Sequence, residues 1–413
     1  MNARPERKLL YIDMAYTVEM VRQKGHMQFF EMRHAGAYFE RVWGVHPIAD
    51  VAGKASRTVE WIPVSDRQIV IEGVAESLPL PRFLLPFNLL ISQWKLLRML
   101  GRLIREQEIS LIFSTDAYYS GLVGLFLKRM TGRPQAVAVF ANQDDLYAAT
   151  GALAMPRLLP FRWLERMVAR LVLSRADLVI AGNRNNLGFA LANGARAPTA
   201  IIPVAKNMEE VHLGDPAERE APFELFAALG IAADTPVMLT VGRLLPLKHP
   251  DEAVRAMAAV IRRHPEAVGL VAGEGPMQPE LEALAASLGA RDRIHFLGQV
   301  DQATLSRIIP KCITLSPLTG MALIECGLGG SPLVAFDRDW QAEFVQDGLT
   351  GFVVPFRDHQ AMAERALRLI EDPELRERMS RSSRQRALDF ADRERINALE
   401  HAAYDELLAR SSR

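Results

Sequence analysis

The 413-residue sequence has only two cysteines, Cys312 and Cys326, and both lie in apolar stretches. Two isolated cysteines exclude a disulfide framework, and their spacing does not match a cysteine zinc site. Such low cysteine usage is typical of the cytoplasm, so we expect a cytoplasmic protein.

A long apolar segment is also missing from the start of the chain. The first eight residues, Met-Asn-Ala-Arg-Pro-Glu-Arg-Lys, lead directly into the short apolar run 9–13. A signal peptide or a first transmembrane helix needs a longer apolar region than this. We therefore expect neither of them, and any membrane contact would be peripheral, on the inner face of the membrane.

Net charge is absent overall, because 49 Lys and Arg residues balance 49 Asp and Glu residues. The charges are unevenly distributed: residues 1–205 carry 25 basic and 17 acidic residues, so this half is +8 and the remainder is −8. A basic half suggests an anionic partner on that side. Alternatively, the opposite charges only favour closure of the two halves. No nucleic acid partner is expected.

What the sequence does have is enough apolar material for two domains. It is 49% hydrophobic, and 413 residues exceed the size of one ordinary core. Residues 206–220 are charged and lack periodicity, so we place the interdomain linker there. After it, strand and helix patterns alternate, which predicts a parallel sheet. The alternating segments are 236–241, 251–263, 267–272, 277–288, 293–298, 303–309, 312–316, 320–329, 332–337, 340–346, 351–354 and 358–371.

Short apolar runs of the kind that form buried strands recur in the first half of the chain. Two predicted helices there, 88–105 and 160–174, are basic and amphipathic. In the second of them, Arg162, Arg166 and Arg170 fall at i, i+4 and i+8 and form one cationic line. These helices are either ordinary surface helices that cover a sheet or a patch that contacts an anionic membrane.

The stretch 315–337 predicts a strand end, a tight turn, a short helix and a buried strand. Thr319 is placed to cap the helix, and the uncovered amides after it favour a phosphate, as does the helix dipole. Those amides belong to Gly320, Met321 and Ala322. Glu325 follows on an otherwise apolar helix and is placed to bind two ribose hydroxyls. Alternatively, the stretch is an ordinary αβ unit with one partly exposed Glu.

Three segments upstream give this stretch a context. They are Val237 to Pro250, Val271 to Pro276 (Val-Ala-Gly-Glu-Gly-Pro) and His295 to Val300 (His-Phe-Leu-Gly-Gln-Val). Their order and spacing resemble those of glycosyltransferase family 4, most strongly over residues 215–390. The resemblance implies an α/β chain with the GT-B fold, in which two Rossmann-like domains face each other across a cleft. It implies an acceptor-side domain at 1–205, a nucleotide-sugar-binding domain at 206–390, and a helix at 391–413 that packs back on the first domain.

Arg243 and Lys248 follow a buried strand and flank a proline turn, five residues apart. A diphosphate leaving group gains negative charge as the glycosidic bond breaks, and two fixed cations stabilise that charge. We therefore predict that both are catalytic. Alternatively, they are a surface pair of charges in a strand-to-helix turn. No carboxylate and His cluster has metal-ligand spacing, so we expect neither a metal nor another cofactor.

The resemblance also places the nucleotide. Gly273 would let the backbone approach it, although a simple turn is the alternative. Gln299 and Val300 lie where family members hydrogen-bond the base through backbone atoms. The donor is expected to be a nucleotide-diphosphate sugar of the UDP or GDP type.

Two positions depart from the family pattern. Family members carry a first glutamate eight positions before the one at Glu325, and this chain has Pro317 there. They also place a His in a loop of the first domain, where this chain has Ala141 and Asn142. Asp145 is a possible substitute for that His, but we expect Asp144 or Asp145 to cap a helix.

These features together predict a retaining, metal-independent glycosyltransferase. It would move a sugar to a hydroxyl group of a glycan or lipid-linked acceptor, in bacterial surface-polysaccharide or lipid-linked glycan synthesis. Two alternatives remain. One is a nucleotide-sugar epimerase of the same fold, and the other is a catalytically silent homologue that binds nucleotide.

Overall fold

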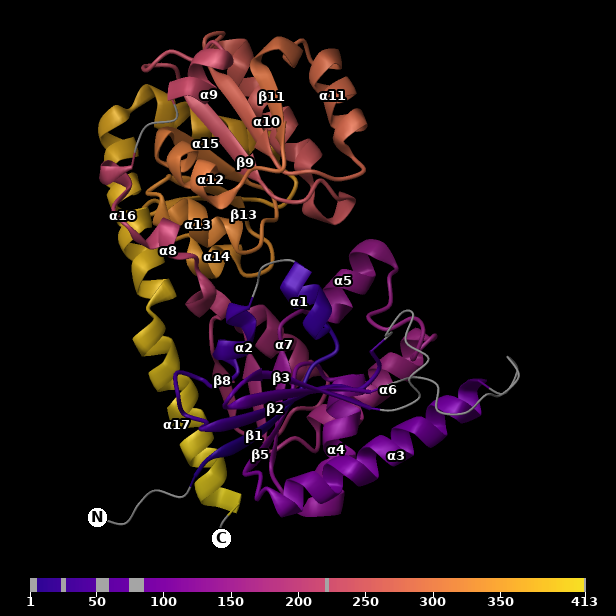
Figure 1. Cartoon of the computed structure of the whole chain (residues 1–413). Helices are drawn as coiled ribbons and strands as arrows, with labels where there is room; N and C mark the ends of the chain where they lie inside the picture. Colours follow the sequence, from indigo (N-terminus) through magenta and orange to yellow (C-terminus); the bar gives the residue numbers. More distant parts are fainter. Residues whose placement is uncertain (1–5, 24–26, 50–58, 74–84, 220–222, 412–413) are drawn as a thin grey trace. The chain divides into compact units, whose positions relative to one another are not determined.

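The computed structural model describes residues 6–23, 27–49, 59–73, 85–219 and 223–411. Contacts within the chain divide it into two compact units, one of residues 1–203 with 394–413 and the other of residues 204–393 (Figure 1). The sequence placed the boundaries after residues 205 and 390. Each unit is built of helices around its own sheet, in agreement with the predicted α/β class.

Within the described residues, the first unit contains an eight-stranded sheet in the order β3-β4-β2-β1-β5-β6-β7-β8. Neighbouring strands are parallel except for β3 and β4, which are antiparallel. Its central strands are apolar and buried because helices cover both faces. The strands are β1 (Lys8–Ile12), β2 (Arg41–His46), β3 (Glu60–Ser65), β4 (Gln68–Glu72), β5 (Leu111–Ser114), β6 (Gln135–Val139), β7 (Leu178–Ala181) and β8 (Thr199–Ile201).

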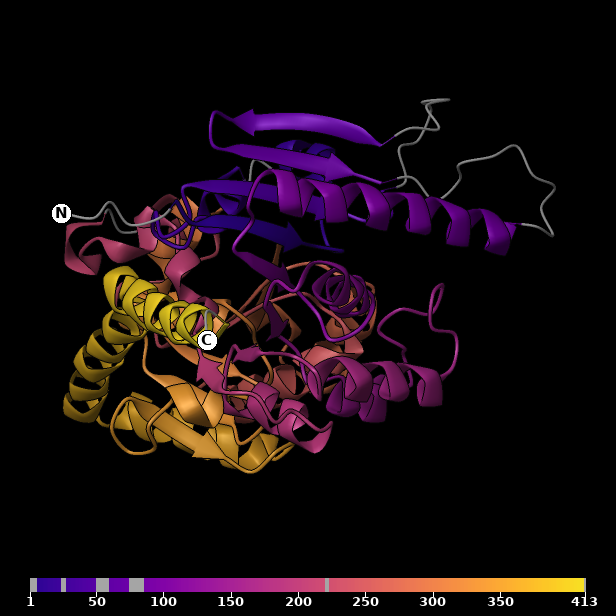
Figure 2. The same ribbon diagram turned by 90° about the horizontal axis from the view of Figure 1, so that it is seen from below.

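Helices cover this sheet by burying one apolar stripe each. Leu100 and Ile104 of α3 pack on Ile12 and Val45, and Figures 1 and 2 both show α3 running along the sheet. On the other face, α1 and α2 bury an apolar cluster that includes Val18. The helices described in this unit are α1 (Val18–Gln23), α2 (Gln28–Met32), α3 (Leu85–Glu106), α4 (Tyr119–Thr131), α5 (Gln143–Thr150), α6 (Arg162–Leu173), α7 (Arg184–Ala192) and α17 (Arg393–Ser411).

The last helix, α17, docks on the first unit through aromatic side chains. The Tyr404 ring lies 5.4 Å from the Tyr38 ring and 5.2 Å from the Phe39 ring, measured between centroids. The Tyr38 hydroxyl donates a hydrogen bond of 2.8 Å to Asp405. The family resemblance implied that this helix packs on the first domain, and these contacts are the physical basis for that position.

The described part of the second unit has a six-stranded parallel sheet in the order β11-β10-β9-β12-β13-β14. Its strands are β9 (Val237–Val241), β10 (Val268–Ala272), β11 (Ile294–Gly298), β12 (Cys312–Ser316), β13 (Leu333–Phe336) and β14 (Gly351–Val354). Its α-helices are α8 (Glu210–Leu213), α9 (Phe223–Ala228), α10 (Pro250–Arg263), α11 (Gln278–Ser287), α12 (Gln302–Ile308), α13 (Ala322–Leu328), α14 (Gln341–Phe344), α15 (His359–Glu371) and α16 (Pro373–Ala391). Its 3-10 helices are η2 (Val204–Asn207), η3 (Pro216–Glu218), η4 (Pro246–Lys248), η5 (Arg291–Arg293) and η6 (Ile309–Lys311).

The predicted alternation of strand and helix is confirmed between β9 and α15. Helix α16 was not predicted, because its many charges dilute the apolar period: only a few positions, such as Met379 and Ala387, are buried. Helix α16 packs against α13, so it supports the element on which the predicted nucleotide contacts lie.

The predicted linker at 206–220 is not an open connection. Residues 206–219 form short helical turns, and two arginines donate hydrogen bonds to main-chain carbonyls of this segment. Arg219 donates to the carbonyls of His212 and Gly214 at 2.9 and 2.7 Å. Arg384 of α16 donates to the carbonyls of Leu213 and Gly214 at 2.7 and 2.9 Å. In the sequence, Arg219 looked like part of a solvated linker, yet it binds backbone carbonyls.

Candidate functional site

The predicted site residues follow strands whose carboxyl ends meet at one edge. Strands β11, β10, β9 and β12 are adjacent and parallel, so the segments that follow them lie side by side. A pocket of about 250 Å3 opens there, within the second unit. One wall consists of residues 240–244 with Lys248 and Pro250, and the other consists of residues 317–322. The predicted residues in this lining are Arg243, Lys248, Gly320, Met321 and Ala322.

Two cations stand on the first wall. The chain turns at η4 after β9, and the Lys248 amide donates to the Leu245 carbonyl at 2.8 Å, which closes the turn. Arg243 is exposed and Lys248 is half-buried. Burial lowers the pKa of the Lys248 ammonium, the Asp339 carboxylate raises it, and the Arg243 guanidinium lowers it further, with a net downward shift. A lowered pKa means that the charged form of Lys248 is less stable here than in water, and a bound anion would stabilise it.

Glycines bring the strand ends close together next to this wall. A Cβ atom at Gly273 would lie 1.9 Å from the Gly242 carbonyl oxygen, and the φ of Gly273 is +142°. The Gly273 amide donates to the Gly298 carbonyl at 2.8 Å. Glycine is therefore required here by packing between β9, β10 and β11. Gly273 does not line the pocket, and its contact with a nucleotide stays a prediction.

The second wall corrects the prediction that Thr319 caps a helix. Helix α13 begins at Ala322, and its N-cap residue is Met321, which makes no side-chain cap. The Thr319 hydroxyl instead lies 2.6 Å from the Ser316 hydroxyl, and the Thr319 amide donates to the Gln341 side chain at 3.3 Å. Thr319 is buried, so it bonds to the neighbouring polar side chains rather than to the helix amides.

Gly320, one of the three residues whose amides are predicted to bind a phosphate, faces open space. In the described chain, a Cβ atom at Gly320 would have no other atom within 4 Å. The amides of Gly320, Met321 and Ala322 lie at the start of α13, on the pocket lining. A helix start carries partial positive charge, which favours an anion at this position.

Glu325 lies one helical turn beyond the pocket lining. It sits on α13 and is half-buried. Burial, and to a smaller extent the charge of Glu209, raises the pKa of the Glu325 carboxyl to about 7. Helix α8, which follows Glu209 directly, packs against α13. Contact of Glu325 with a ribose stays a prediction.

The two residues predicted to contact the base follow β11. Gln299 is exposed and Val300 is half-buried. They lie at the same edge of the sheet as the pocket, but they are not part of its lining. Their contact with a base also stays a prediction.

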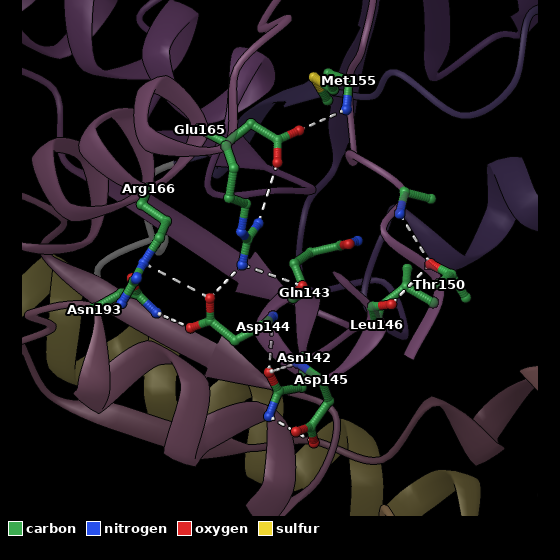
Figure 3. A network of polar contacts seen from close by, with 12 residues as sticks. Asn142, Gln143, Asp144, Asp145, Leu146, Thr150, Met155, Glu165, Arg166 and Asn193 are labelled. Carbon is green, nitrogen blue, oxygen red and sulfur yellow. Dashed lines mark hydrogen bonds and ion pairs between the residues drawn. The ribbon is translucent and has the colours of Figure 1, made fainter. Parts of the chain in front are cut away.

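In the first unit, the loop after β6 corrects a second capping prediction. The Asn142 side chain caps α5 by accepting from the amides of Asp144 and Asp145 at 3.1 and 3.2 Å (Figure 3). Asn142 occupies the N-cap position of α5, and from this position its side-chain oxygen reaches the first free amides of the helix. Asn142 also donates to Asn185 at 3.0 Å. The position where the family pattern has a His next to this loop is thus occupied by a structural cap.

Asp144 has a different partner, and this corrects the predicted cationic line. Its carboxylate forms an ion pair with Arg162. The Arg166 side chain lies 3.8 Å from the same carboxylate (Figure 3). Arg162 also pairs with Glu165 at 3.1 Å and has a side-chain exposure of 15%. Arg162 is therefore largely neutralised, while Arg166 and Arg170 remain exposed.

Three residues near the predicted site were missed by sequence reasoning. Asp339 acts on the charge of Lys248, Glu209 acts on the charge of Glu325, and Gln341 bonds to the second wall. In the sequence Asp339 is part of Asp337-Arg-Asp339, and nothing in this segment links it to Lys248. Within the described residues, no three side chains of His, Cys, Asp or Glu are grouped so that they could hold a metal ion.

Comparison with known proteins gives matches along most of the chain. The family profile "Glycosyl transferase 4-like domain" matches residues 32–205, and "Glycosyl transferases group 1" matches residues 223–386. A D-inositol 3-phosphate glycosyltransferase of Frankia alni is 30% identical over 303 residues, which cover 68% of this chain and 70% of that protein. An alpha-D-kanosaminyltransferase of Streptomyces kanamyceticus is 35% identical over 159 residues, which cover 36% of this chain and 40% of that protein.

Solved structures match over nearly the whole chain. HepE from Anabaena, in complex with UDP, matches with a TM-score of 0.71 and 20% identity, over 97% of this chain and 100% of that one. Sucrose-phosphate synthase from Thermosynechococcus elongatus matches with a TM-score of 0.70 and 20% identity, over 98% and 100%. By sequence, the chain spans 40% and 60% of the length of two curated relatives, the kanosaminyltransferase and a D-inositol 3-phosphate glycosyltransferase of Streptomyces avermitilis.

Proposed function

The chain belongs to glycosyltransferase family 4 and has the GT-B fold, and from this premise we propose that it is a retaining glycosyltransferase. The reaction moves a sugar from a nucleoside diphosphate sugar to a hydroxyl group, without a metal ion. The acceptor is a glycan or a lipid-linked intermediate of bacterial surface-polysaccharide or lipid-linked glycan synthesis. The donor is of the UDP or GDP type, and because HepE binds UDP, UDP sugars are the first donors to test.

The observation that carries this proposal is the pairing of two cations with a helix start across one pocket. Arg243 and Lys248 stand on one wall, and the residues that lead into α13 form the other. A diphosphate placed between them would receive hydrogen bonds from the backbone and charge from both side chains. Because Lys248 is half-buried, its charge acts in a medium less polar than water and stabilises the leaving group more strongly.

Recognition of the donor sugar differs from the family pattern in this proposal. Pro317 lines the pocket at the position of the first family glutamate, and its side chain has no polar atom. The sugar hydroxyls are therefore held by main-chain groups of residues 318–322. Glu325 holds the ribose, and Gly273, Gln299 and Val300 lie on the side of the base.

The test is transfer itself. Purified protein is incubated with radiolabelled UDP and GDP sugars, with and without a bacterial membrane extract and with EDTA in a parallel series. We expect acceptor-dependent transfer that EDTA does not abolish, and NMR of the product should show the donor's anomeric configuration. Isomerised donor would favour the epimerase, and nucleotide binding without turnover would favour the silent homologue.

We also propose that the first unit binds an anionic membrane peripherally, on its cytoplasmic face. Helix α3 packs against α4, and α4 packs against α6. Large apolar side chains are exposed along them: Phe87 60%, Leu90 66%, Trp94 55%, Phe126 48%, Met130 43%, Trp163 65% and Met167 52%, with Phe161 56% just before α6. Aromatic side chains among cations are typical of helices that lie in a membrane interface.

The basic residues on α3 lie among these apolar groups. A groove of about 480 Å3 runs beside α3 and is lined by Trp61, Trp94, Lys95, Arg98 and Arg102, among others. The Arg98 guanidinium lies over the Trp94 ring, 4.7 Å from its centroid. Among the helices that the structure describes, none has the length and apolar character that a membrane crossing requires. A surface contact of this kind would bring the protein to a lipid-linked acceptor.

A further inference from the structure

The side chain of Gln341 is completely buried beside the second wall of the pocket. Its Nε2 donates to the carbonyl of Pro317 at 3.0 Å and to the carbonyl of Phe336 at 3.3 Å. Its Oε1 accepts from the Thr319 amide at 3.3 Å and from the Ser316 hydroxyl. One amide group thus joins the end of β13 to the turn that follows β12.

These contacts matter because the turn itself has few other means of holding its shape. Pro317 has no amide hydrogen to donate, so its carbonyl is the only main-chain group of this residue that can form a hydrogen bond. Inside the turn, the hydroxyls of Ser316 and Thr319 lie 2.6 Å apart. Gly320, the next residue, adds no side-chain packing. The position of the wall therefore depends on Gln341.

We propose that Gln341 is a positioning residue for the donor: by fixing the main chain of Pro317 to Thr319, it holds the amides of residues 320–322 where the donor diphosphate binds. The inference rests on the proposed function. It also explains how a chain with proline at 317 can hold a donor through its main chain. A wall that recognises the ligand by backbone atoms must be rigid, since each misplaced amide weakens a hydrogen bond.

The substitution Gln341→Leu separates this role from simple packing. Leucine fills a similar volume but leaves the buried Pro317 carbonyl and the Thr319 amide without their Gln341 partner, so the turn must move to find others. The Phe336 carbonyl keeps its hydrogen bond from the Arg338 amide. The bound ligand must then order the turn again. We expect nucleoside diphosphate to bind roughly ten to a hundredfold more weakly. Burial favours the neutral form of a glutamic acid at this position, so Gln341→Glu keeps an acceptor oxygen for Thr319 and one hydroxyl donor for a carbonyl, and its loss should be smaller.

A matched control exists in the first unit. Gln135 is also completely buried, and its amide donates to the Ser114 hydroxyl at 3.0 Å and to the Gly121 carbonyl at 2.9 Å. Gln135→Leu should lower the melting temperature as Gln341→Leu does, because both leave buried polar groups unpaired. It should not change nucleotide affinity, because Gln135 is outside the pocket lining.

The experiment measures calorimetric affinity for UDP and GDP, together with amide hydrogen exchange of residues 316–322, in the wild type and in these variants. We expect faster exchange and weaker binding in Gln341→Leu, partial recovery in Gln341→Glu, and no change of either in Gln135→Leu. If the leucine variant does not fold, Gln341→Glu and Ser316→Ala provide the same comparison with smaller losses.

Two results would overturn the inference, and they are distinguishable. Wild-type binding of UDP or GDP with unchanged affinity in the Gln341 variants contradicts the positioning role alone. A wild-type protein that binds neither nucleotide contradicts the proposed function, and the positioning role with it.

Discussion

Arg243 and Lys248 line the same pocket, five residues apart in sequence, and the charge of Arg243 acts on Lys248. Burial contributes most to the lowered pKa of Lys248, Asp339 opposes the shift, and Arg243 adds to it. The two like charges at this pocket therefore disfavour each other. A pair in this arrangement is stabilised when an anion with more than one charge lies between them.

The first prediction is that Lys248→Ala lowers turnover by roughly 10² to 10³, or about 2.7 to 4 kcal/mol. The leaving diphosphate carries more charge in the transition state than in the bound donor, so donor binding should weaken less than turnover. The double variant with Arg243→Ala should lose less than the sum of the two single losses, because both side chains act on one charge.

Steady-state kinetics and thermal unfolding on the same preparations test this prediction. Lys311→Ala is the control, since Lys311 is exposed on η6 and lies outside the pocket lining. A Lys248→Ala protein that melts earlier but turns over at the wild-type rate would show that the lysine is only structural.

The second prediction is that Glu325→Gln weakens nucleotide binding by roughly 10 to 100-fold. Glutamine keeps the shape and one acceptor but removes the charge that strengthens both ribose hydrogen bonds. Calorimetry with UDP or GDP measures the change. Glu374→Gln on α16 is the control, because its side chain is 91% exposed. Equal affinity in wild type and Glu325→Gln would exclude the ribose contact.

The third prediction concerns pH. In the free protein, Glu325 holds its proton below about pH 7, because burial and then Glu209 raise the pKa of its carboxyl. Ribose hydroxyls bind the carboxylate better than the acid, so nucleotide affinity should rise with pH and level off above about 7, with release of a proton on binding.

The diphosphate also titrates, near pH 6, but this contribution is common to wild type and Glu325→Gln. The difference between their two affinity profiles therefore isolates Glu325. Calorimetry in buffers of different ionisation enthalpy counts the released proton. Parallel profiles for the two proteins would contradict this assignment.

The fourth prediction is that Glu325→Gln stabilises the free protein at alkaline pH. A carboxyl whose pKa is raised on folding binds its proton more tightly in the folded state, so wild-type stability is lost as pH rises from about 4.5 to about 7. Glutamine has no such loss. The free energy of unfolding of the variant should exceed that of wild type by on the order of 1 to 3 kcal/mol at pH 8, and the difference should disappear near pH 4. Urea unfolding at several pH values measures it, and a constant difference would contradict it.

The fifth prediction tests the membrane contact. Each cation near an anionic surface contributes on the order of 1 kcal/mol, so the double change Arg98→Glu and Arg102→Glu should weaken vesicle binding by roughly tenfold or more. Sedimentation with phosphatidylserine-containing vesicles at low salt measures this. Arg378→Glu with Arg381→Glu on α16 is the control, since both arginines are exposed on the second unit. If wild type does not sediment with the vesicles, the contact does not exist.

The sequence by itself determined the alternation of strands and helices from β9 to α15 and the place of Arg243 and Lys248 at a strand end. Both follow from local patterns. An apolar run of four or five residues between turn residues has few other conformations in which it can be buried, and the turn comes directly after it.

Only the tertiary structure decided which polar groups bond to each other. From the sequence, Thr319 was expected to cap a helix. It bonds instead to Ser316 and Gln341, because β13 pairs with β12 and Gln341, which follows β13, lies next to the turn after β12. From the sequence, Arg162 was expected to be one of three cations on a helix surface, but it forms an ion pair with Asp144, which lies in the first turn of α5. A polar side chain can form hydrogen bonds with several kinds of group. Its actual partner depends on which distant segments the fold brings next to it.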